Sequence, residues 1–288
     1  MTVTSLDSES QLREMYPTSR DILNELHSEG AHVRHEVNAT KLKRYLFHND
    51  GNDPVKFNRV VFNFPHYVAG GGVGNKDKCN KIHRHRQLLL NFFTSASQVL
   101  AHDGQIWVTL CAGQEETSLE TKTRSAGDTW QIVHCAAAAR LLLQDAHDCP
   151  VDALADLGYY SVGYQSRDKA FWIGNGITNV FCHEATDHKP CFSIQWTRGI
   201  SFWVTDEQLF TEDLLLDIIR KHFLIKTMTV SISLLDEYRC VKSGRKSVTY
   251  RFNISSFSLA LFRDRVNTLV ETALRAIENS SFGASRAS

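Results

Sequence analysis

The sequence predicts two domains, an α/β domain followed by a smaller α+β domain. Short apolar runs alternate with helical patterns through the first half of the chain, which favours layers of helices on a largely parallel sheet. The pattern pauses at Thr186–Pro190 (TDHKP), and strand and helix signals then follow in a different order. We therefore expect one domain over residues 1–186 and a second over residues 187–288.

The first domain is expected to follow the order β-α-β-β-α-β, with one more helix after it. Gly30 is a stop signal for the first helix, and Asp103-Gly104 is a turn before the fourth strand. The last helix is expected from an Ala-rich segment that is apolar on most sides. The strands are Thr2–Leu6, His32–Val37, Arg59–Phe64 and Gln105–Leu110, and the helices are Leu12–Leu26, Ile82–Leu100 and Trp130–Leu143.

The second domain is expected to follow the order β-α-β-β-α, and the end of the chain leaves room for a last short strand. Its two long strands are joined by the turn Lys242-Ser243-Gly244. This order is that of a ferredoxin-like split βαβ unit. The strands are Ile200–Val204, Met228–Tyr238 and Ser247–Ile254, and the helices are Asp213–Phe223 and Leu259–Ile277.

Composition limits the class of protein. Lys and Arg together number 32, as do Asp and Glu, so any basic surface must be local. The 7 cysteines form no CxxC pair, which favours reduced thiols inside the cell. No apolar run approaches the roughly 20 residues of a membrane span, and no targeting sequence is visible. We expect a cytoplasmic protein without a membrane segment, with the nucleolus as the alternative location.

The first motif that points to chemistry is Asn63-Phe64-Pro65-His66, where an apolar strand ends. In a doubly wound sheet, ligands bind beyond the carboxyl ends of the strands. Asn63 offers an amide acceptor, and Phe64, which precedes proline, is expected to be extended with its carbonyl held toward the crevice. Two fixed acceptors suit a planar N–H group such as a nucleobase nitrogen. His66 can accept a proton, and Phe64 or Tyr67 can stack on the ring.

The same motif also has a purely structural explanation. Asn and Pro are common in loops, so the segment can be a turn after an edge strand with His66 solvated. The basic stretch that follows (KDKCNKIHRHR) is either a phosphate-binding patch at a helix start or a solvated helix face. Cys79, His83 and His85 lie in it, but no second ligand pair has matching spacing, so no metal site is expected.

Four segments of the first half resemble a known family: VTSLDSESQLREMYP, VNATKL, FNRVVFNFPHYVAGGG and RQLLLNFFTSASQVLAHDGQIWVTL. They are similar to the Rossmann-like ribosomal RNA uridine-N3 methyltransferase-like family, over roughly residues 2–180. The resemblance implies transfer of a methyl group from S-adenosylmethionine to a pyrimidine ring nitrogen. It also implies that Asn63, Phe64, Pro65 and His66 form the catalytic motif after the fourth strand of that fold.

Segments of the second half resemble another family: TRGISFWV, VSISLLDEYRC, SGRKSVTYRFNISS and LFRDRVNTLVETALRAI. They are similar to the ferredoxin-fold anticodon-binding domain at the end of the phenylalanyl-tRNA synthetase β chain, over roughly residues 191–288. Together the two halves resemble the ferredoxin-fold anticodon-binding domain-containing proteins. Both resemblances imply RNA, ribosomal or transfer, as the partner.

The chain departs from the methyltransferase pattern at its start. The family carries a central first strand and a Gly-rich turn before the segment that matches VTSLD, and both are missing here. Asp7 matches the acidic position that holds the cofactor's ribose, and Asn38 stands where the family has an Asp near the adenine. We therefore expect a sheet that closes up, recruits another segment or stays open. We also expect weak or absent S-adenosylmethionine binding and no methyl transfer by the chain as given.

Basic residues of the second half gather at one turn and the strand after it. Lys242, Arg245, Lys246 and Arg251 can grip phosphates, and Tyr250 between them can stack on an exposed base. Neighbouring strand residues point to opposite faces, so Tyr250 or Arg251 can instead belong to the sheet.

Three function classes remain open: an rRNA uridine methyltransferase, a catalytically inactive RNA-binding module and a synthetase-associated partner. The oligomeric state is left open by the sequence.

Overall fold

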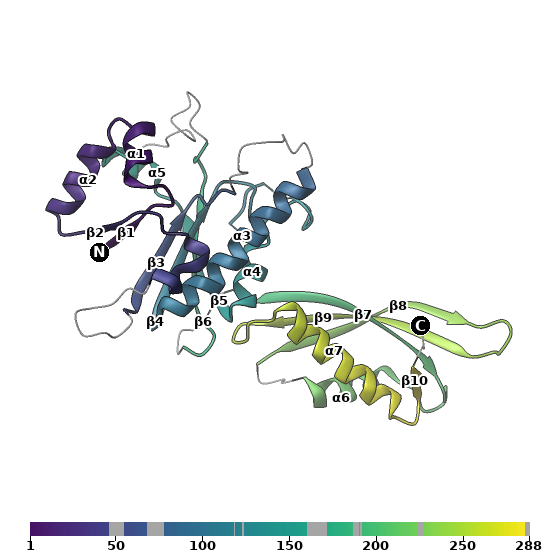
Figure 1. Ribbon diagram of the computed structural model, residues 1–288. Helices are drawn as coiled ribbons and strands as arrows, with labels where there is room; N and C mark the ends of the chain where they lie inside the picture. Colours follow the sequence, from purple (N-terminus) through teal and green to yellow (C-terminus); the bar gives the residue numbers. More distant parts are fainter. Residues whose placement is uncertain are drawn as a thin grey trace. The chain divides into compact units, whose positions relative to one another are not determined.

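The computed structural model describes residues 1–45, 55–67, 78–117, 119–122, 124–159, 172–186, 190, 192–223 and 227–285 (Figure 1). The chain divides into two compact units, Met1–Thr186 and Asp187–Ser288. None of the described helices is both long enough and apolar enough to cross a membrane.

The N-terminal segment forms a parallel pair of short strands connected by two helices. Ser8 begins the first helix with a capping box, in which its side chain and that of Gln11 satisfy backbone N–H groups reciprocally. The single helix predicted over Leu12–Leu26 is wrong, because Tyr16, which precedes proline, is extended (φ −130°, ψ 99°) and divides it. Gly30 (φ +73°) follows the second helix as expected. The elements are β1 (Thr2–Thr4), α1 (Glu9–Met15), α2 (Ser19–Ser28) and β2 (His32–Arg34).

A four-stranded sheet forms the centre of the first unit, in the order β3-β4-β6-β5. Its β3–β4 pair is parallel, whereas the β4–β6 and β5–β6 pairs are antiparallel. The prediction of a largely parallel sheet is therefore wrong for this sheet, because two of its strands were not foreseen. The strands are β3 (Phe57–Asn63), β4 (Leu100–Leu110), β5 (Leu141–Asp148) and β6 (Ile177–His183).

The helix predicted over Trp130–Leu143 is correct only in its first part. Helix α4 (Ile132–Ala138) ends before Arg140, whose φ of +60° breaks the helical path. Leu141–Leu143 then enter β5, where they are buried and pair with β6. A run of leucines has no strand or helix period of its own, so the antiparallel neighbour decides its conformation.

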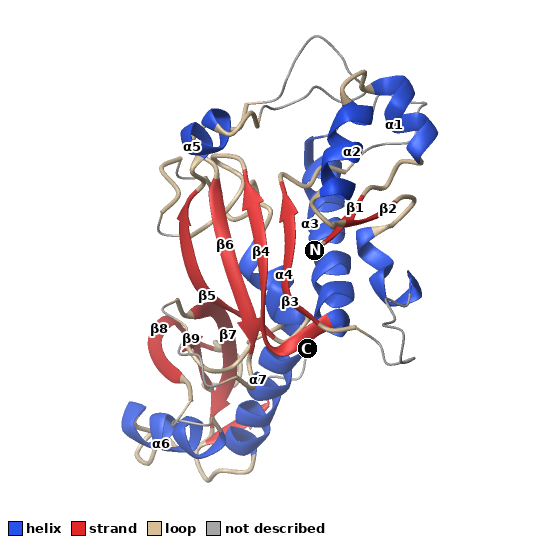
Figure 2. Cartoon of the chain, turned by 90° about the vertical axis from the view of Figure 1, so that its left-hand side faces the viewer, coloured by secondary structure: helices blue, strands red, loops and turns tan. Residues whose placement is uncertain are grey.

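One face of this sheet is covered by α3 (Lys78–Val99) and α4, which lie behind it in Figure 2. Phe62 of β3 packs on Phe92 with ring centroids 4.6 Å apart, and Phe93 meets Phe181 of β6 at 4.8 Å. A short 3₁₀ segment, η1 (Ala39–Tyr45), packs along α3, and α5 (Val151–Asp156) follows β5. These aromatic contacts form the core that fixes α3 to the sheet.

The described strands of the first unit form two separate sheets. Among the described strands, β1 pairs with β2 alone and β3 pairs with β4 alone. The outer edges of β1 and β3 are thus left without a strand neighbour in the part of the chain that the structure describes. Of the three outcomes expected for the sheet, the described strands show neither closure between β1 and β3 nor a recruited strand there.

The second unit is a four-stranded antiparallel sheet with two helices on one face (Figure 1). The predicted element order and the last short strand are confirmed, although the first strand begins earlier than expected. Thr211 caps α6 by accepting a hydrogen bond from the Leu214 N–H. The elements are β7 (Ile194–Val204), α6 (Glu212–His222), β8 (Thr229–Arg239), β9 (Lys246–Ser256), α7 (Arg263–Glu278) and β10 (Gly283–Ser285), with the strands in the order β10-β7-β9-β8.

Candidate functional site

Asn63 lies at the carboxyl end of β3, as the sequence predicts, and its side chain is exposed. Its Oδ1 accepts a hydrogen bond from the Thr109 hydroxyl of β4 at 3.0 Å, and that hydroxyl lies 3.0 Å from the Thr178 hydroxyl of β6. Three neighbouring strands therefore orient this amide. One lone pair of Oδ1 and the amide N–H groups remain to meet a ligand at the strand ends.

Phe64 differs from its expected geometry in two ways. Its φ is +47°, in the left-handed region, whereas a residue before proline is expected to be extended. Its ring is 7% exposed and packs at Gly176, so it cannot stack on a bound base. The Phe64 N–H donates to the Thr109 carbonyl at 2.8 Å, which holds the unusual conformation. Such backbone strain in a non-glycine residue is a feature of functional sites.

His66 belongs to an aromatic cluster. The centroid of its ring lies 5.4 Å from that of His85 and 5.5 Å from that of Trp130, with edge-on geometry in both pairs. The His85 and Trp130 rings stack on each other with centroids 4.1 Å apart. The His85 ring lies 2.7 Å from the Lys81 carbonyl through Nδ1, so that nitrogen is the donor. Burial is the main cause that lowers the pKa of His85, the hydrogen bond to the Lys81 carbonyl raises it, and the charges of His66 and Lys81 lower it further; the net effect favours the neutral ring. His66 itself is exposed, beside Pro65, which is buried.

Arg86, on α3, holds the loop that carries Trp130. Its guanidinium donates to the Thr129 carbonyl at 2.7 and 3.0 Å and to the Ala126 carbonyl at 2.8 Å. This residue of the basic stretch therefore has a structural partner. Arg84 lies over the exposed Tyr67 ring at 5.3 Å, so Tyr67 is available for stacking where Phe64 is not. Lys76, of the same stretch, lies outside the described residues.

Glu115 is a buried titratable residue in the loop after β4 that the sequence reasoning missed. It follows β4 at the same sheet edge as Asn63, and it is 1% exposed. Burial raises the pKa of this carboxyl to about 7, although hydrogen bonds from Thr117 and Asn179 act in the opposite direction. A carboxyl with such a pKa exchanges protons near neutral pH. The signal in the sequence was the pair Glu115-Glu116 in the loop that follows the apolar strand β4.

Asp7 and Asn38 lie together at the carboxyl ends of β1 and β2. The Glu36 N–H donates to the Asp7 carbonyl at 3.3 Å. The side-chain oxygen of Asn38, however, accepts two hydrogen bonds from the turn that follows. They come from the Thr40 N–H at 2.9 Å and from the Thr40 hydroxyl at 2.7 Å. Both lone pairs of that oxygen are thereby used. Asn38 thus uses its acceptor within the turn that begins η1.

The four basic residues predicted to bind RNA in the second unit, and Tyr250 between them, have different surroundings in the structure. Tyr250 is 2% exposed and lies near the Phe210 ring, so the alternative that it belongs to the sheet is correct and base stacking is not. Lys246 forms an ion pair with Glu237 at 2.8 Å. Arg245 lies over the Trp203 ring at 4.8 Å. Lys242 is exposed in the turn, and Arg251 is exposed on β9.

No group of three or more histidine, cysteine, aspartate or glutamate side chains is arranged to hold a metal ion among the residues that the structure describes. Nothing is described of the Cys79 side chain. His85 is turned to the Lys81 carbonyl and to Trp130.

Comparisons with known proteins show what the chain is similar to. A family model described as "BMT5-like: rRNA (uridine-N3-)-methyltransferase BTM5-like" matches residues 1–153. A mouse protein named "Ferredoxin-fold anticodon-binding domain-containing protein 1 homolog" is 35% identical over 57% of this chain and 24% of its own length. The human protein of that name is 31% identical over 63% of this chain and 26% of its own length. The chain thus spans about a quarter of these relatives.

A solved structure, an S-adenosylmethionine-dependent methyltransferase from Clostridium acetobutylicum, is similar with a TM-score of 0.31 and 12% identity. The alignment covers 63% of this chain and 74% of that chain.

Proposed function

The chain belongs to the BMT5-like family of rRNA (uridine-N3-)-methyltransferase-like proteins, and from this premise we propose that it acts on RNA in rRNA base methylation, with its second unit as the RNA-binding part. Two alternatives are a catalytically inactive RNA-binding module and a partner of a tRNA synthetase. The observation that carries the RNA assignment is the face of the second unit's sheet that no described helix of this unit covers, here called the open face.

This open face is polar and built for hydrogen bonding. Helices α6 and α7 cover the other face, where Phe202 and Phe252 are fully buried. Because strand residues alternate, the neighbours of these residues point outward. Ser201 and Thr249 are bonded at 2.9 Å, and the Thr197 hydroxyl donates to Asn253 at 3.1 Å. Arg251 is exposed on the same strand as Thr249 and Asn253.

Two aromatic side chains and one arginine lie near one end of this face. Trp203 and Tyr238 lie 6.5 Å apart, and Arg245 covers Trp203. Arginine and aromatic side chains beside hydroxyls are suited to the phosphates and bases of unpaired RNA. The strand order β10-β7-β9-β8 is that of a ferredoxin-like unit, and the printed names of the relatives speak of a ferredoxin-fold anticodon-binding domain.

In the first unit, Asn63 supports a role in positioning the target base. Its amide, held by Thr109, presents an acceptor beyond the strand end, where a ring N–H of uridine can donate. His66 supplies an exposed imidazole at this edge, and burial brings the pKa of the Glu115 carboxyl to about 7.

The cofactor fits the described residues only in part. S-adenosylmethionine would supply the methyl group, and Asp7 offers a carboxylate for its ribose hydroxyls. Asn38, which stands where the family has an Asp near the adenine, uses its side-chain oxygen for the Thr40 N–H and hydroxyl. We therefore derive no catalytic step through the cofactor.

RNA binding provides the main test. Affinity for an rRNA fragment and for a tRNA is measured against salt for wild type, for Arg245→Glu/Arg251→Glu, and for Arg220→Glu/Lys221→Glu on α6 as the charge-matched control. The open-face variant should bind about tenfold or more weakly and show a flatter salt dependence, since each lost phosphate contact reduces the slope by about 0.7 for single strands. Equal losses in both variants, or no RNA binding by wild type, would reject the assignment. Co-purification with a synthetase subunit without RNA affinity would favour the synthetase alternative.

A second experiment examines the methyl-transfer side. In a preparation that methylates rRNA, Asn63→Ala should abolish the single-turnover step and leave S-adenosylmethionine affinity nearly unchanged. Loss of cofactor affinity with an unchanged chemical step would move Asn63 into the cofactor pocket.

A further inference from the structure

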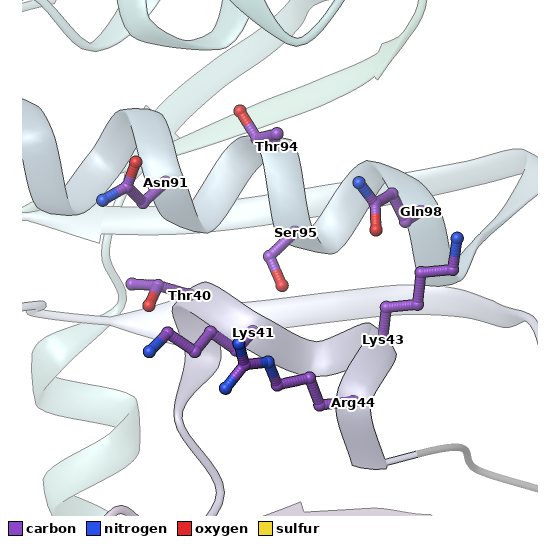
Figure 3. Close-up of a pocket in the computed structure, with 8 residues that line it drawn as sticks. All are labelled: Thr40, Lys41, Lys43, Arg44, Asn91, Thr94, Ser95 and Gln98. Atoms are coloured by element: carbon purple, nitrogen blue, oxygen red, sulfur yellow. The ribbon is translucent and has the colours of Figure 1, made fainter.

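A groove of about 360 Å³ lies between η1 and α3 in the first unit (Figure 3). Lys41, Lys43 and Arg44 come from η1 on one side. Polar side chains of α3 face them: Asn91, Thr94, Ser95 and Gln98. Lys43 reaches toward Gln98, whereas Lys41 and Arg44 extend along the opposite rim.

The groove has a fixed shape because η1 is tied to α3 and to itself. The Leu42 N–H donates to the Ser95 hydroxyl at 2.6 Å, and the Leu42 side chain is buried. Asn38 caps the start of η1 through Thr40, and its own N–H donates to the Tyr45 hydroxyl at 2.8 Å. A ligand therefore meets cations whose backbone is already ordered, which reduces the entropy lost on binding.

The charge of the groove is unbalanced. Neither η1 nor α3 contains an aspartate or glutamate. Lys41, Lys43 and Arg44 are exposed and have no ion-pair partner among the described residues. Lys56 stands at one end, where its ammonium donates to the Gln98 carbonyl at 2.6 Å. In a chain of zero formal net charge, this is a local positive surface.

The lining chemistry favours phosphates over bases. The described residues that line the groove include no aromatic side chain, so this lining offers charge and hydrogen bonds rather than stacking. The Asn91 Oδ1 accepts from Gln87 at 2.9 Å, which leaves its amide N–H groups as donors. Side-chain amides, a hydroxyl and three cations along two rims match the repeated oxygens of a phosphodiester chain.

We propose that the η1–α3 groove binds the sugar–phosphate backbone of the RNA on which the protein acts, as a contact additional to the open face of the second unit. This inference rests on the proposed function. A backbone contact of this kind carries no sequence information but fixes the register of the RNA.

The test uses the full chain and charge-matched variants. Lys43→Glu/Arg44→Glu changes the groove, and Arg20→Glu/Lys221→Glu changes exposed cations elsewhere by the same net charge. Circular dichroism and melting confirm that each variant is folded. The groove variant should lose about tenfold or more in affinity for the rRNA fragment at ~0.1 M salt, and its salt slope should fall by about 1.4, because two phosphate contacts are removed. The control should match wild type.

Several results would overturn the inference. Wild-type RNA binding that the groove variant retains in full refutes the groove alone and leaves the proposed function intact, whereas absence of wild-type RNA binding refutes both. If millimolar inorganic phosphate or uridine monophosphate competes with RNA for wild type but not for the groove variant, the groove is a site for a small phosphate. If wild type binds poly-glutamate and the groove variant does not, while the two proteins bind RNA with equal affinity, the groove is a site for an acidic protein instead.

Discussion

Glu115 gives a prediction about pH in which the sign and size follow from the structure. The carboxyl is 1% exposed, and burial raises its pKa from 4.5 to about 7. In the unfolded chain the pKa returns to its ordinary value. At pH values between the two pKa values, the folded state therefore binds more protons than the unfolded state. The stability of the first unit must therefore fall as pH rises through this window.

The magnitude follows from the shift. At 1.36 kcal/mol per pKa unit, the full effect is about 3 kcal/mol, absent well below pH ~4.5 and complete above pH ~7. Between about pH 5.5 and about pH 8 the cost of holding the buried carboxylate grows by about 2 kcal/mol. Glu115→Gln removes the titration and keeps the side chain's shape. The variant should gain about 2 kcal/mol relative to wild type over that interval.

Urea unfolding measures this difference. Protection of peptides from β4 and β6 against hydrogen exchange reports on the first unit separately from the second. With a slope of about 1–3 kcal/mol per molar urea, the midpoint difference should grow by roughly 1 M between the two pH values. Burial lowers the pKa of His85 and His183, which makes stability rise with pH, but this contribution is shared by both proteins and cancels.

Glu14→Gln, on the exposed side of α1, serves as the control and should follow wild type. A difference between Glu115→Gln and wild type that stays constant with pH would refute the reasoning. So would a variant that becomes relatively less stable at high pH.

Two further predictions concern the second unit. Residues 187–288, expressed alone, should unfold cooperatively, because α6 and α7 cover one sheet face with their own apolar stripes; a gradual thermal transition would contradict this. Tyr250→Phe should destabilise the unit by about 1 kcal/mol, since the buried hydroxyl donates to Glu212 and burial with this bond raises the pKa of Tyr250. RNA affinity of that variant should equal wild type, and a selective loss of RNA binding with an unchanged melting temperature would return Tyr250 to the RNA surface.

Local signals in the sequence were sufficient where a segment's conformation is set by its own residues. The β-α-β-β-α-β order of the second unit follows from amphipathic periods, and Gly30 and Gly244 adopt positive φ where a helix and a turn require it. The strand end at Asn63 is also local, because the apolar run stops there. Each of these depends on neighbours within a few residues, so no partner strand was needed to foresee it.

Contacts between distant segments decided the rest. Leu141–Leu143 become a strand because β6 offers an antiparallel edge, and the Phe64 conformation depends on the Thr109 carbonyl of another strand. Tyr250 and Glu115 carry ordinary polar groups. The packing around Tyr250 makes it part of the core, and the burial of Glu115 raises the pKa of its carboxyl to about 7. The sequence determines which side chains are present and which local structures they favour. Burial and pairing arise from the whole fold, and they determine what those side chains can do.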